Sequence, residues 1–272
     1  MSQYISKTPN QQGYIEFDTI ENETWQLLFA RQVVIVQGRA CEAFIQGLKG
    51  INFPQGKIPQ CPEMDKKLSQ ATGWSVQPVP ALIPTDAFYD LLKNRKFPVA
   101  TFIRTREEFD YLKEPDIFHE YFGHCPLLTN QAYADFVQWY AENALKLDCS
   151  KKRNLLLRLF WFTIEFGIFK TNQGWQVYGG GILSSPGETV YATDSDIPER
   201  RPFVLEDVLR TPYRYDIMQP IYYYLRSLSD LYDLMQLDLD EYLEKALAKG
   251  DFAPHSKLLE APKVKATEDK AC

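Results

Sequence analysis

Apolar residues recur at intervals of three and four along most of the chain, with polar residues between them. This spacing puts the apolar side chains on one face of an α-helix and predicts helices packed on a common core. Thr19 or Asn22 offers an N-terminal cap for the first helix. The ranges with this pattern are 19–48, as one or two helices, and 63–72, 85–95, 105–109, 116–123, 129–147, 151–171 and 215–249.

Prolines and glycines mark where the helical pattern stops. Residues 74–84 contain three prolines and are predicted to be extended. We also predict a connecting loop at 50–62, a short strand at 99–104 and a hairpin at 175–193. The sequence therefore predicts a mainly α fold with a small β element. We expect one folded domain over 14–250, between a flexible N-terminus at 1–13 and a C-terminal tail at 251–272.

Aromatic side chains are the unusual part of the composition. Hydrophobic residues make up 45% of the chain and charged residues 24%, which is ordinary for a globular protein, while 14% are Phe, Tyr or Trp. So many rings indicate either a core built from large aromatic side chains or a pocket lined with rings for an aromatic ligand.

Charge and cysteine content exclude several classes of partner. A net charge of −6 and a pI near 5.3 argue against nucleic-acid binding, which needs a basic face. No apolar run approaches the ~20 residues that span a bilayer, and the first residues lack the apolar core of a signal peptide. The five cysteines include no Cys-x-x-Cys pair, which excludes a zinc ribbon and argues against a disulfide framework. We therefore expect a cytoplasmic protein with neither nucleic-acid nor membrane partners.

Two of the three histidines, His119 and His124, lie within six residues. Zinc proteases place two histidines four apart, one turn of an α-helix, but here the second comes one position later. On an ideal α-helix, five steps turn it ~140° away from the first. Both rings can then face one ion only if the helix ends between them, and Gly123 followed by Pro126 suits such an end. We predict His119 on the last turn of a helix and His124 just beyond it.

A carboxylate would complete this pair as the two-His, one-carboxylate triad of Fe(II) enzymes that activate oxygen. Glu165 stands alone among large apolar residues in the run LFWFTIEFG (159–167). The structural alternative is a buried Glu paired with a Lys or Arg. No basic residue lies one helical turn away, at 161, 162, 168 or 169, so metal ligation is favoured.

Four runs of the chain resemble the pterin-dependent aromatic amino acid hydroxylases, most closely the bacterial phenylalanine 4-hydroxylases. They are PDIFHEYFGHCPL (115–127), WFTIEFG (161–167), YGGGILSSPGE (178–188) and QPIYY (219–223), and they stand in the family's order. The likeness spans about residues 14–225. It implies a single catalytic domain, built as a helical basket around a non-haem iron, within the range 14–250 predicted above.

The resemblance implies the chemistry and its cofactors. The metal is Fe(II) on His119, His124 and Glu165, and the cosubstrates are O2 and a tetrahydropterin. The implied reaction hydroxylates L-phenylalanine to L-tyrosine, the first step of phenylalanine catabolism. Tryptophan and tyrosine remain as alternative substrates, because ring selection depends on the shape of the pocket.

The resemblance also assigns substrate contacts. Arg104 falls where the family binds the amino acid's carboxylate, and Asp116 is placed to hold that guanidinium. An Arg at a strand end is otherwise a solvated charge. Ser184 matches a residue near the polar end of the substrate, although a Ser in a Gly-rich turn also serves the turn itself. The residues that match the walls around the aromatic ring are Pro115, Trp161 and Phe166.

The pterin contacts implied by the resemblance lie in the proline-fixed stretch. Backbone groups of Ala81, Leu82 and Ile83 would read the edge of the heterocycle, and Phe88 would stack on it. Phe88 could equally be a core residue of its helix. Glu120 corresponds to a polar residue near the pterin and the iron-bound water. The chain departs from the animal enzymes at Ala81, at Phe160 in place of a tyrosine, and at Leu112 in place of a threonine that helps bind the substrate carboxylate.

Two other functions compete with hydroxylation. A zinc metallohydrolase is disfavoured by the His spacing, and a helical binding protein without catalysis would leave the solitary Glu165 unexplained. Expected partners are the small-molecule substrates and an enzyme that recycles the pterin, with the chain as a monomer or small homo-oligomer.

Overall fold

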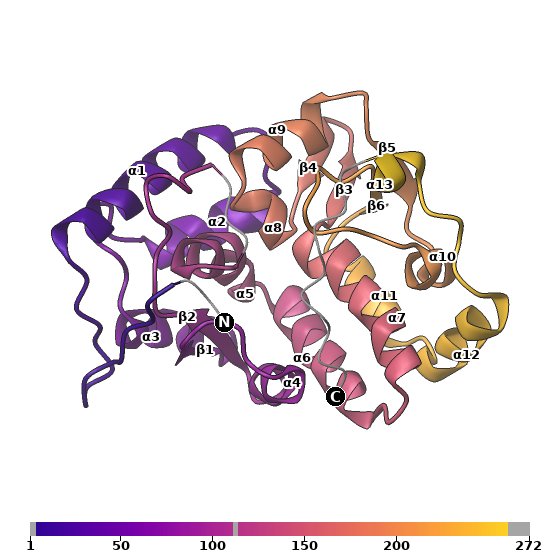
Figure 1. The fold of residues 1–272 in the computed structure, drawn as a ribbon, viewed down its shortest axis with the longest axis horizontal. Coiled ribbons are helices and arrows are strands. Elements are labelled where there is room, and N and C mark those ends of the chain that lie inside the picture. The colour runs from indigo at the N-terminus through magenta and orange to yellow at the C-terminus, as the bar shows by residue number, and fades with distance from the viewer. Residues whose placement is uncertain (1–3, 111–113, 261–272) are drawn as a thin grey trace.

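Helices account for most of the structure, a computed structural model that describes residues 4–110 and 114–260 (Figure 1). The α-helices are α1 (Thr19–Ile35), α2 (Glu42–Ile51), α3 (Cys61–Thr72), α4 (Thr85–Lys93), α5 (Cys125–Leu128), α6 (Gln131–Lys146), α7 (Ser150–Phe160), α8 (Gly180–Leu183), α9 (Pro186–Asp194), α10 (Leu205–Arg210), α11 (Asp230–Met235), α12 (Leu239–Lys249) and α13 (Ser256–Glu260). Two π-helical segments, η1 (His119–His124) and η2 (Trp161–Glu165), are found in the described ranges. The predicted mainly α fold with a small β element is confirmed.

The β element consists of two small sheets. Strands β1 (Ser75–Val79) and β2 (Lys96–Ala100) pair in parallel and are joined by α4. The second sheet has the order β4-β3-β6-β5, formed by β3 (Ile168–Thr171), β4 (Gly174–Val177), β5 (Glu199–Pro202) and β6 (Ile221–Leu225). Its β3–β4 pair is an antiparallel hairpin, and β6 pairs in parallel with both β3 and β5.

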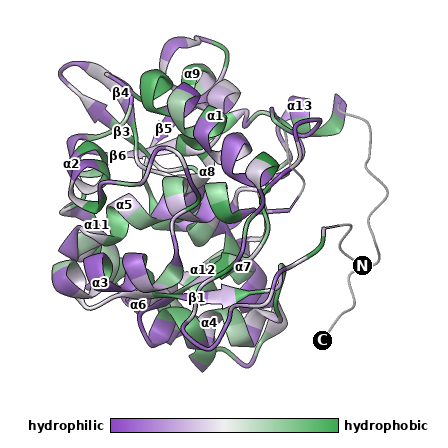
Figure 2. Cartoon of the chain, turned by 90° about the vertical axis from the view of Figure 1, so that its left-hand side faces the viewer, coloured by the Kyte–Doolittle hydropathy of each residue, from purple (hydrophilic) through white to green (hydrophobic). Residues whose placement is uncertain are grey.

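Large aromatic side chains fill the core, as the composition allows. Trp25, Trp74 and Tyr121 are fully buried, and the ring of Trp25 lies edge-on to those of Phe118 and Tyr121. Polar and apolar residues are interspersed along the surrounding helices (Figure 2), and apolar residues of these helices, such as Leu28 of α1 and Phe44 of α2, are buried in the core. Helix α6 packs on α4 and α11, while α7 packs on α10 and α12.

Local signals set the ends of several helices, and one of them differs from the prediction. Asp18, rather than Thr19 or Asn22, caps α1, and its side chain accepts a hydrogen bond from the backbone N–H of Glu21 in a capping box. Helix α3 ends as predicted at Gly73, whose φ of 77° suits a residue without a Cβ.

Two predictions in the middle of the chain are corrected. The strand expected at 99–104 is β2, which begins at Lys96 because it pairs residue by residue with β1 from Ser75 onward. The helix expected at 105–109 is absent, since this short stretch forms only turns and bends. A stretch of five residues gains too few hydrogen bonds to offset helix nucleation.

The second half contains three further corrections. The helix predicted at 151–171 ends at Glu165, and the hairpin predicted at 175–193 lies earlier, in β3 and β4, where Gly174 with φ 108° follows the turn. Residues 180–194 are instead helical, in α8 and α9. The helical range predicted at 215–249 holds α11 and α12, but it begins with β6.

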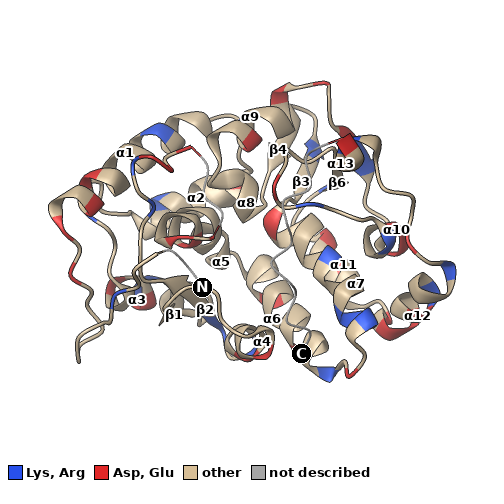
Figure 3. Ribbon diagram, in the orientation of Figure 1, with Lys and Arg blue, Asp and Glu red and all other residues tan. Residues whose placement is uncertain are grey.

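The outer surface carries charges of both signs. Helices α1, α10 and α12 each carry both acidic and basic residues, so the net charge is not gathered on one element (Figure 3). Across residues 4–110 and 114–260, none of the helices combines the length and apolar character needed to span a bilayer. In the tail predicted at 251–272, α13 occupies 256–260 and its Leu258 is buried; residues 261–272 and, at the other end, 1–3 lie outside the described residues.

Candidate metal centre and substrate cavity

His119 and His124 face one point because η1 is a π-helix. Its backbone hydrogen bonds span five residues: the N–H of Cys125 donates to the carbonyl oxygen of Glu120. In this register, residues five apart stand one turn above each other, so both rings share a face. The prediction that the helix ends between the two histidines is therefore wrong. The helix continues through Gly123, which is not in the left-handed region, and runs into α5.

Glu165 comes from the second π-helical segment. Helix α7 passes directly into η2, where the N–H of Phe166 donates to the oxygen of Trp161 at 2.8 Å, again five residues apart. The carboxylate lies 3.3 Å from Nε2 of His124 and 3.8 Å from Nε2 of His119. The two Nε2 atoms are 3.2 Å apart. One potential ligand atom from each of the three residues therefore lies within 4.8 Å of the others.

Close packing by α8 brings the two segments together. Helix α8 contacts both η1 and η2. A Cβ at Gly180 would lie 2.3 Å from Cε1 of His124, and a Cβ at Gly123 would lie 2.6 Å from the oxygen of Gly180. Two neighbouring glycines of α8 have different surroundings. Gly181 lines the cavity, but Gly180 lets α8 approach a histidine of the triad.

Hydrogen bonding and burial leave His119 ready to bind a cation. Burial lowers the pKa of His119 to about 4, despite the nearby Glu165, so the ring is neutral at pH 7. The Ser184 hydroxyl donates to the oxygen of Gly180 at 2.9 Å, and Nδ1 of His119 lies 2.9 Å from the same hydroxyl oxygen. Ser184 therefore accepts from Nδ1–H, which leaves the lone pair on Nε2, the atom that faces Glu165.

The charge state of Glu165 completes the fit to a metal. Burial would raise the pKa of this carboxyl, but His124, His119 and the N–H of Gly181 outweigh it and hold the pKa below its usual value. One carboxylate and two imidazoles thus converge. This is the donor set of non-haem Fe(II) oxygenases, which keeps coordination positions open for other ligands. The residues present fit an iron ion.

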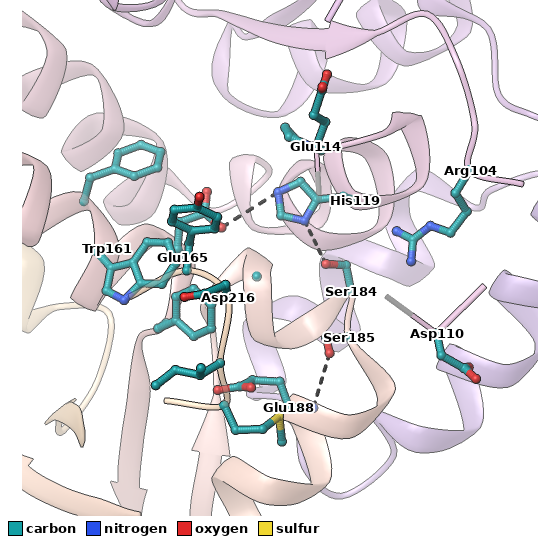
Figure 4. Close-up of a pocket in the computed structure, with 17 residues that line it drawn as sticks. Arg104, Asp110, Glu114, His119, Trp161, Glu165, Ser184, Ser185, Glu188 and Asp216 are labelled. Atoms are coloured by element: carbon teal, nitrogen blue, oxygen red, sulfur yellow. Dashed lines mark hydrogen bonds and ion pairs between the residues drawn. The ribbon is translucent and has the colours of Figure 1, made fainter. Parts of the chain in front are cut away.

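A cavity of about 740 Å³ opens beside this triad (Figure 4). Arg104 and Trp161 lie at opposite sides of the view, with His119 and Ser184 between them. The residues that line it are Arg104, Asp110, Glu114, Pro115, His119, Phe160, Trp161, Glu165, Phe166, Gly181, Ser184, Ser185, Glu188, Tyr215, Asp216, Ile217 and Met218. Five of the six residues predicted to contact the substrate are among them; the sixth, Asp116, is not.

Asp116 instead holds Arg104. Its carboxylate accepts hydrogen bonds from Nε, Nη2 and the backbone N–H of Arg104, each at 2.9 Å. Asp116 is fully buried, and burial opposes its charge, but the Arg104 guanidinium keeps the pKa of this carboxyl low. The same carboxylate accepts the backbone N–H of His119 at 3.0 Å. One buried acid therefore fixes both the guanidinium and the start of η1.

Aromatic rings form the opposite wall. The indole of Trp161 lies between the rings of Phe166 and Tyr213, with both centroids 4.3 Å away. Trp161, Phe166 and Pro115 give the cavity an apolar end, while Arg104 gives it a cationic one. The arrangement suits a ligand with an aromatic ring and a carboxylate.

The residues predicted to contact the pterin do not line this cavity. Leu82 is exposed, and Phe88 lies edge-on to Phe160 at 5.7 Å, so it reaches the cavity only through that ring. Burial, together with the charges of Glu165 and Asp116, raises the pKa of Glu120 well above its usual value. The remaining two pterin residues, Ala81 and Ile83, are half-buried, and the departure at Leu112 lies outside the described residues.

Sequence reasoning missed the loop that closes the cavity. Tyr215, Asp216, Ile217 and Met218 line it from the segment between α10 and β6. They stand at the start of the range 215–249, which was predicted to be helical, and the only signal of a place in the cavity was their position directly before the QPIYY run. Glu188, at the end of the third run, also lines the cavity and was given no role.

Known proteins resemble the chain over nearly its whole length. A family model described as "Biopterin-dependent aromatic amino acid hydroxylase" matches residues 3–261. Phenylalanine-4-hydroxylase of Vibrio cholerae is 50% identical over 254 residues, covering 93% of this chain and 88% of that protein. The apo structure of the cold-active phenylalanine hydroxylase from Colwellia psychrerythraea superposes with a TM-score of 0.93 at 49% identity, covering 95% and 100%. A Chromobacterium violaceum phenylalanine hydroxylase with bound oxidised Fe(III) gives a TM-score of 0.86 at 36% identity, covering 90% and 89%.

Proposed function

The chain belongs to the biopterin-dependent aromatic amino acid hydroxylases, and from this membership we propose that it is a phenylalanine 4-monooxygenase. It hydroxylates L-phenylalanine to L-tyrosine with O2 and a tetrahydropterin at a non-haem Fe(II). The observation that carries the proposal is the cavity itself, where a two-His, one-Glu triad lies between a guanidinium and an aromatic wall. A π-helix can align the histidine pair of a hydrolase as well, so His spacing does not exclude that function; family membership does.

In this proposal His119, His124 and Glu165 hold the iron. When bound, the iron supplies the redox chemistry that lets O2 react with the ring, which is otherwise spin-forbidden. Ser184 keeps the lone pair of His119 on Nε2, and Gly180 lets α8 pack on His124. The protein's own contribution is to fix these donors in place before reaction.

Arg104 binds the substrate carboxylate and sets the direction of the amino acid. Two of its nitrogens are occupied by Asp116, while Nη1 has no hydrogen bond among the described residues and the side chain lines the cavity. Trp161, Phe166 and Pro115 hold the ring, and Ser184 lies near the polar end of the substrate. Carboxylate and ring are therefore gripped at opposite sides, which orients the para carbon.

The electron balance of the reaction defines the role of the pterin. Reduction of O2 takes four electrons: two come from the ring position that is hydroxylated, and two from the tetrahydropterin. One oxygen atom ends in tyrosine and the other in hydroxypterin. Backbone groups of Ala81, Leu82 and Ile83, the ring of Phe88 and the carboxyl of Glu120 bind the pterin in this proposal. Their partial separation from the cavity suits a cosubstrate that occupies its own subsite.

Cellular context follows from this activity. The reaction is the first step of phenylalanine catabolism, it takes place in the cytoplasm, and a pterin-recycling enzyme restores the cosubstrate. Residues 14–250 form the catalytic domain, between the terminal segments 1–13 and 251–272, and the chain acts as a monomer or small homo-oligomer.

The test is anaerobic reconstitution with Fe(II), followed by phenylalanine, tryptophan or tyrosine with tetrahydropterin and O2. Tyrosine should form from phenylalanine faster than either other product forms, with one iron bound per chain. A zinc-loaded control should be inactive. Full activity with zinc, or no tyrosine with iron, would contradict the proposal.

A further inference from the structure

The orientation of Trp161 is not fixed by its ring neighbours alone. Its indole is stacked on Tyr213 at an interplanar angle of 18° and lies at 31° to Phe166. Stacking restrains the tilt of a ring, but it permits sliding and rotation within the ring plane because dispersion has little direction. A directional contact at the indole N–H is needed to fix the remaining freedom.

Gln219 supplies that contact. Nε1 of Trp161 donates to Oε1 of Gln219 at 3.0 Å. On the other side of the amide, Nε2 donates to the backbone oxygens of Arg214 at 2.7 Å and Ile217 at 2.9 Å. Turning the amide over would face its NH2 toward the indole N–H and its oxygen toward two carbonyls. Because Gln219 is only 1% exposed, water could not replace the hydrogen bonds lost in this way. The side-chain oxygen of Gln219 is therefore held toward the indole N–H of Trp161.

The backbone of Gln219 is anchored as well. Its N–H donates to Oε1 of Glu188 at 3.0 Å, and the hydroxyl of Tyr222 donates to the same oxygen. Glu188 belongs to α9 and is 5% exposed, so the anchor is part of the buried frame. Gln219 therefore joins three parts of the molecule: the loop 214–218, the α9 frame and the indole on the cavity wall.

We infer that Gln219 is a positioning residue that holds the indole of Trp161, and through it the substrate ring, in register with the metal triad. The inference rests on the proposed function. Its consequence is coupling: with the indole fixed, each pterin oxidised yields one tyrosine. With the indole free to slide, pterin is still oxidised, but the ring is out of place more often. Even ~1 Å of misplacement lowers a reaction rate about a hundredfold.

The experiment measures tyrosine formed per pterin oxidised in Gln219→Met, which keeps the length of the side chain and removes both polar ends. The ratio should fall about fivefold, the factor that one net hydrogen bond contributes to an equilibrium. Gln219→Glu keeps an acceptor for the indole and should retain more of the coupling. Trp161→Phe removes the indole N–H and should also uncouple, and Gln219→Met should add little in that background.

A matched control separates positioning from folding. Gln138, on α6 outside the cavity lining, likewise accepts from a side-chain N–H, of Arg95, and donates to a backbone oxygen, of Lys93. Gln138→Met should lower the melting temperature but leave the ratio unchanged. In ¹H–¹⁵N spectra, the indole N–H signal that disappears in Trp161→Phe should shift in Gln219→Met, which reports the lost bond without turnover.

Three results would overturn the inference. The first is an unchanged ratio of tyrosine to oxidised pterin in Gln219→Met, and the second is an indole N–H signal that does not shift in that variant. The third is an equal fall of the ratio when Gln219→Met is made in the wild type and in Trp161→Phe. If Gln219→Met does not fold, Gln219→Glu takes its place. Because this variant keeps an acceptor for the indole, it should stay more tightly coupled than Trp161→Phe, and uncoupling as complete as in Trp161→Phe would overturn the inference. A wild-type protein that forms no tyrosine would instead overturn the proposed function, and this inference with it.

Discussion

Replacing Arg104 with Lys tests whether this residue binds substrate or only supports the fold. The guanidinium uses Nε and Nη2 for Asp116, both at 2.9 Å, and its third nitrogen remains for a ligand in the cavity. A Lys has one nitrogen on a flexible stem, so it cannot grip Asp116 in a fork and a substrate carboxylate at the same time. The positive charge beside Asp116 is kept, whereas the geometry is lost.

The magnitude follows from these contacts. A hydrogen bond to a charged group contributes about 1.5–3 kcal/mol, so its loss should raise KM for phenylalanine about ten- to hundredfold. KM for the pterin should change little, because none of the residues assigned to it contacts the guanidinium. Stability should fall by less than the ~3–5 kcal/mol that removal of one partner of a buried ion pair costs, since Lys still pairs with Asp116.

The assay is steady-state kinetics with each substrate varied in turn, together with thermal melts. Arg158→Lys is the matched control, because Arg158 also grips a carboxylate in a fork, that of Asp251 at 2.7 and 2.8 Å, but does not line the cavity. It should leave both KM values unchanged. Equal rises in the two KM values of Arg104→Lys, or a collapsed melting temperature with unchanged KM, would show that Arg104 is structural.

Three further predictions concern the metal, the coupling and acid stability. Glu165→Gln keeps the shape and removes the charge, so iron measured by metal analysis should fall well below one per chain and turnover should be lost; an active variant with full iron would refute the triad. Trp161→Ala, once shown to be folded, should oxidise pterin faster than it forms tyrosine, whereas Phe88→Ala should raise KM for pterin and stay coupled. A coupled Trp161→Ala with an uncoupled Phe88→Ala would show that the ring pocket and the pterin site had been assigned the wrong way round. Burial opposes the charge of Asp116, but Arg104 outweighs it and lowers the pKa of this carboxyl. The ionised Asp116 therefore stabilises the folded protein above ~pH 4, and this contribution is lost as the pH falls through the folded-state pKa. Urea midpoints of wild type and Asp116→Asn should therefore differ most near neutral pH and converge in acid; a constant difference would refute this.

The sequence identified the three residues that come together in the structure, but it did not predict the backbone that carries them. His119, His124 and Glu165 could be found because charged and metal-binding side chains are conspicuous among apolar residues. The register of η1 could not, because its reason lies far away in the chain. The close approach of Gly123 to Gly180 fits the wide turn, and no local pattern reports a contact across 57 positions.

The missed parts of the cavity have a similar cause. Residues 215–218 form a loop at the start of a range predicted to be helical. The side chain of Gln219 holds this loop by donating to the backbone oxygens of Arg214 and Ile217, and the backbone N–H of Gln219 donates to Glu188. Strand β2 likewise begins where its partner β1 begins rather than where its own β-forming residues are densest. In each case, long-range pairing decided what local propensity left open.

The two π-helical segments make the metal centre sensitive to changes outside its ligands. Each segment has more residues per turn than an α-helix, and α8 packs against both of them. A Cβ at Gly180 would collide with the ring of His124, and a Cβ at Gly123 would collide with the backbone of Gly180. A substitution at either glycine would therefore displace a donor without altering any ligand atom of the triad.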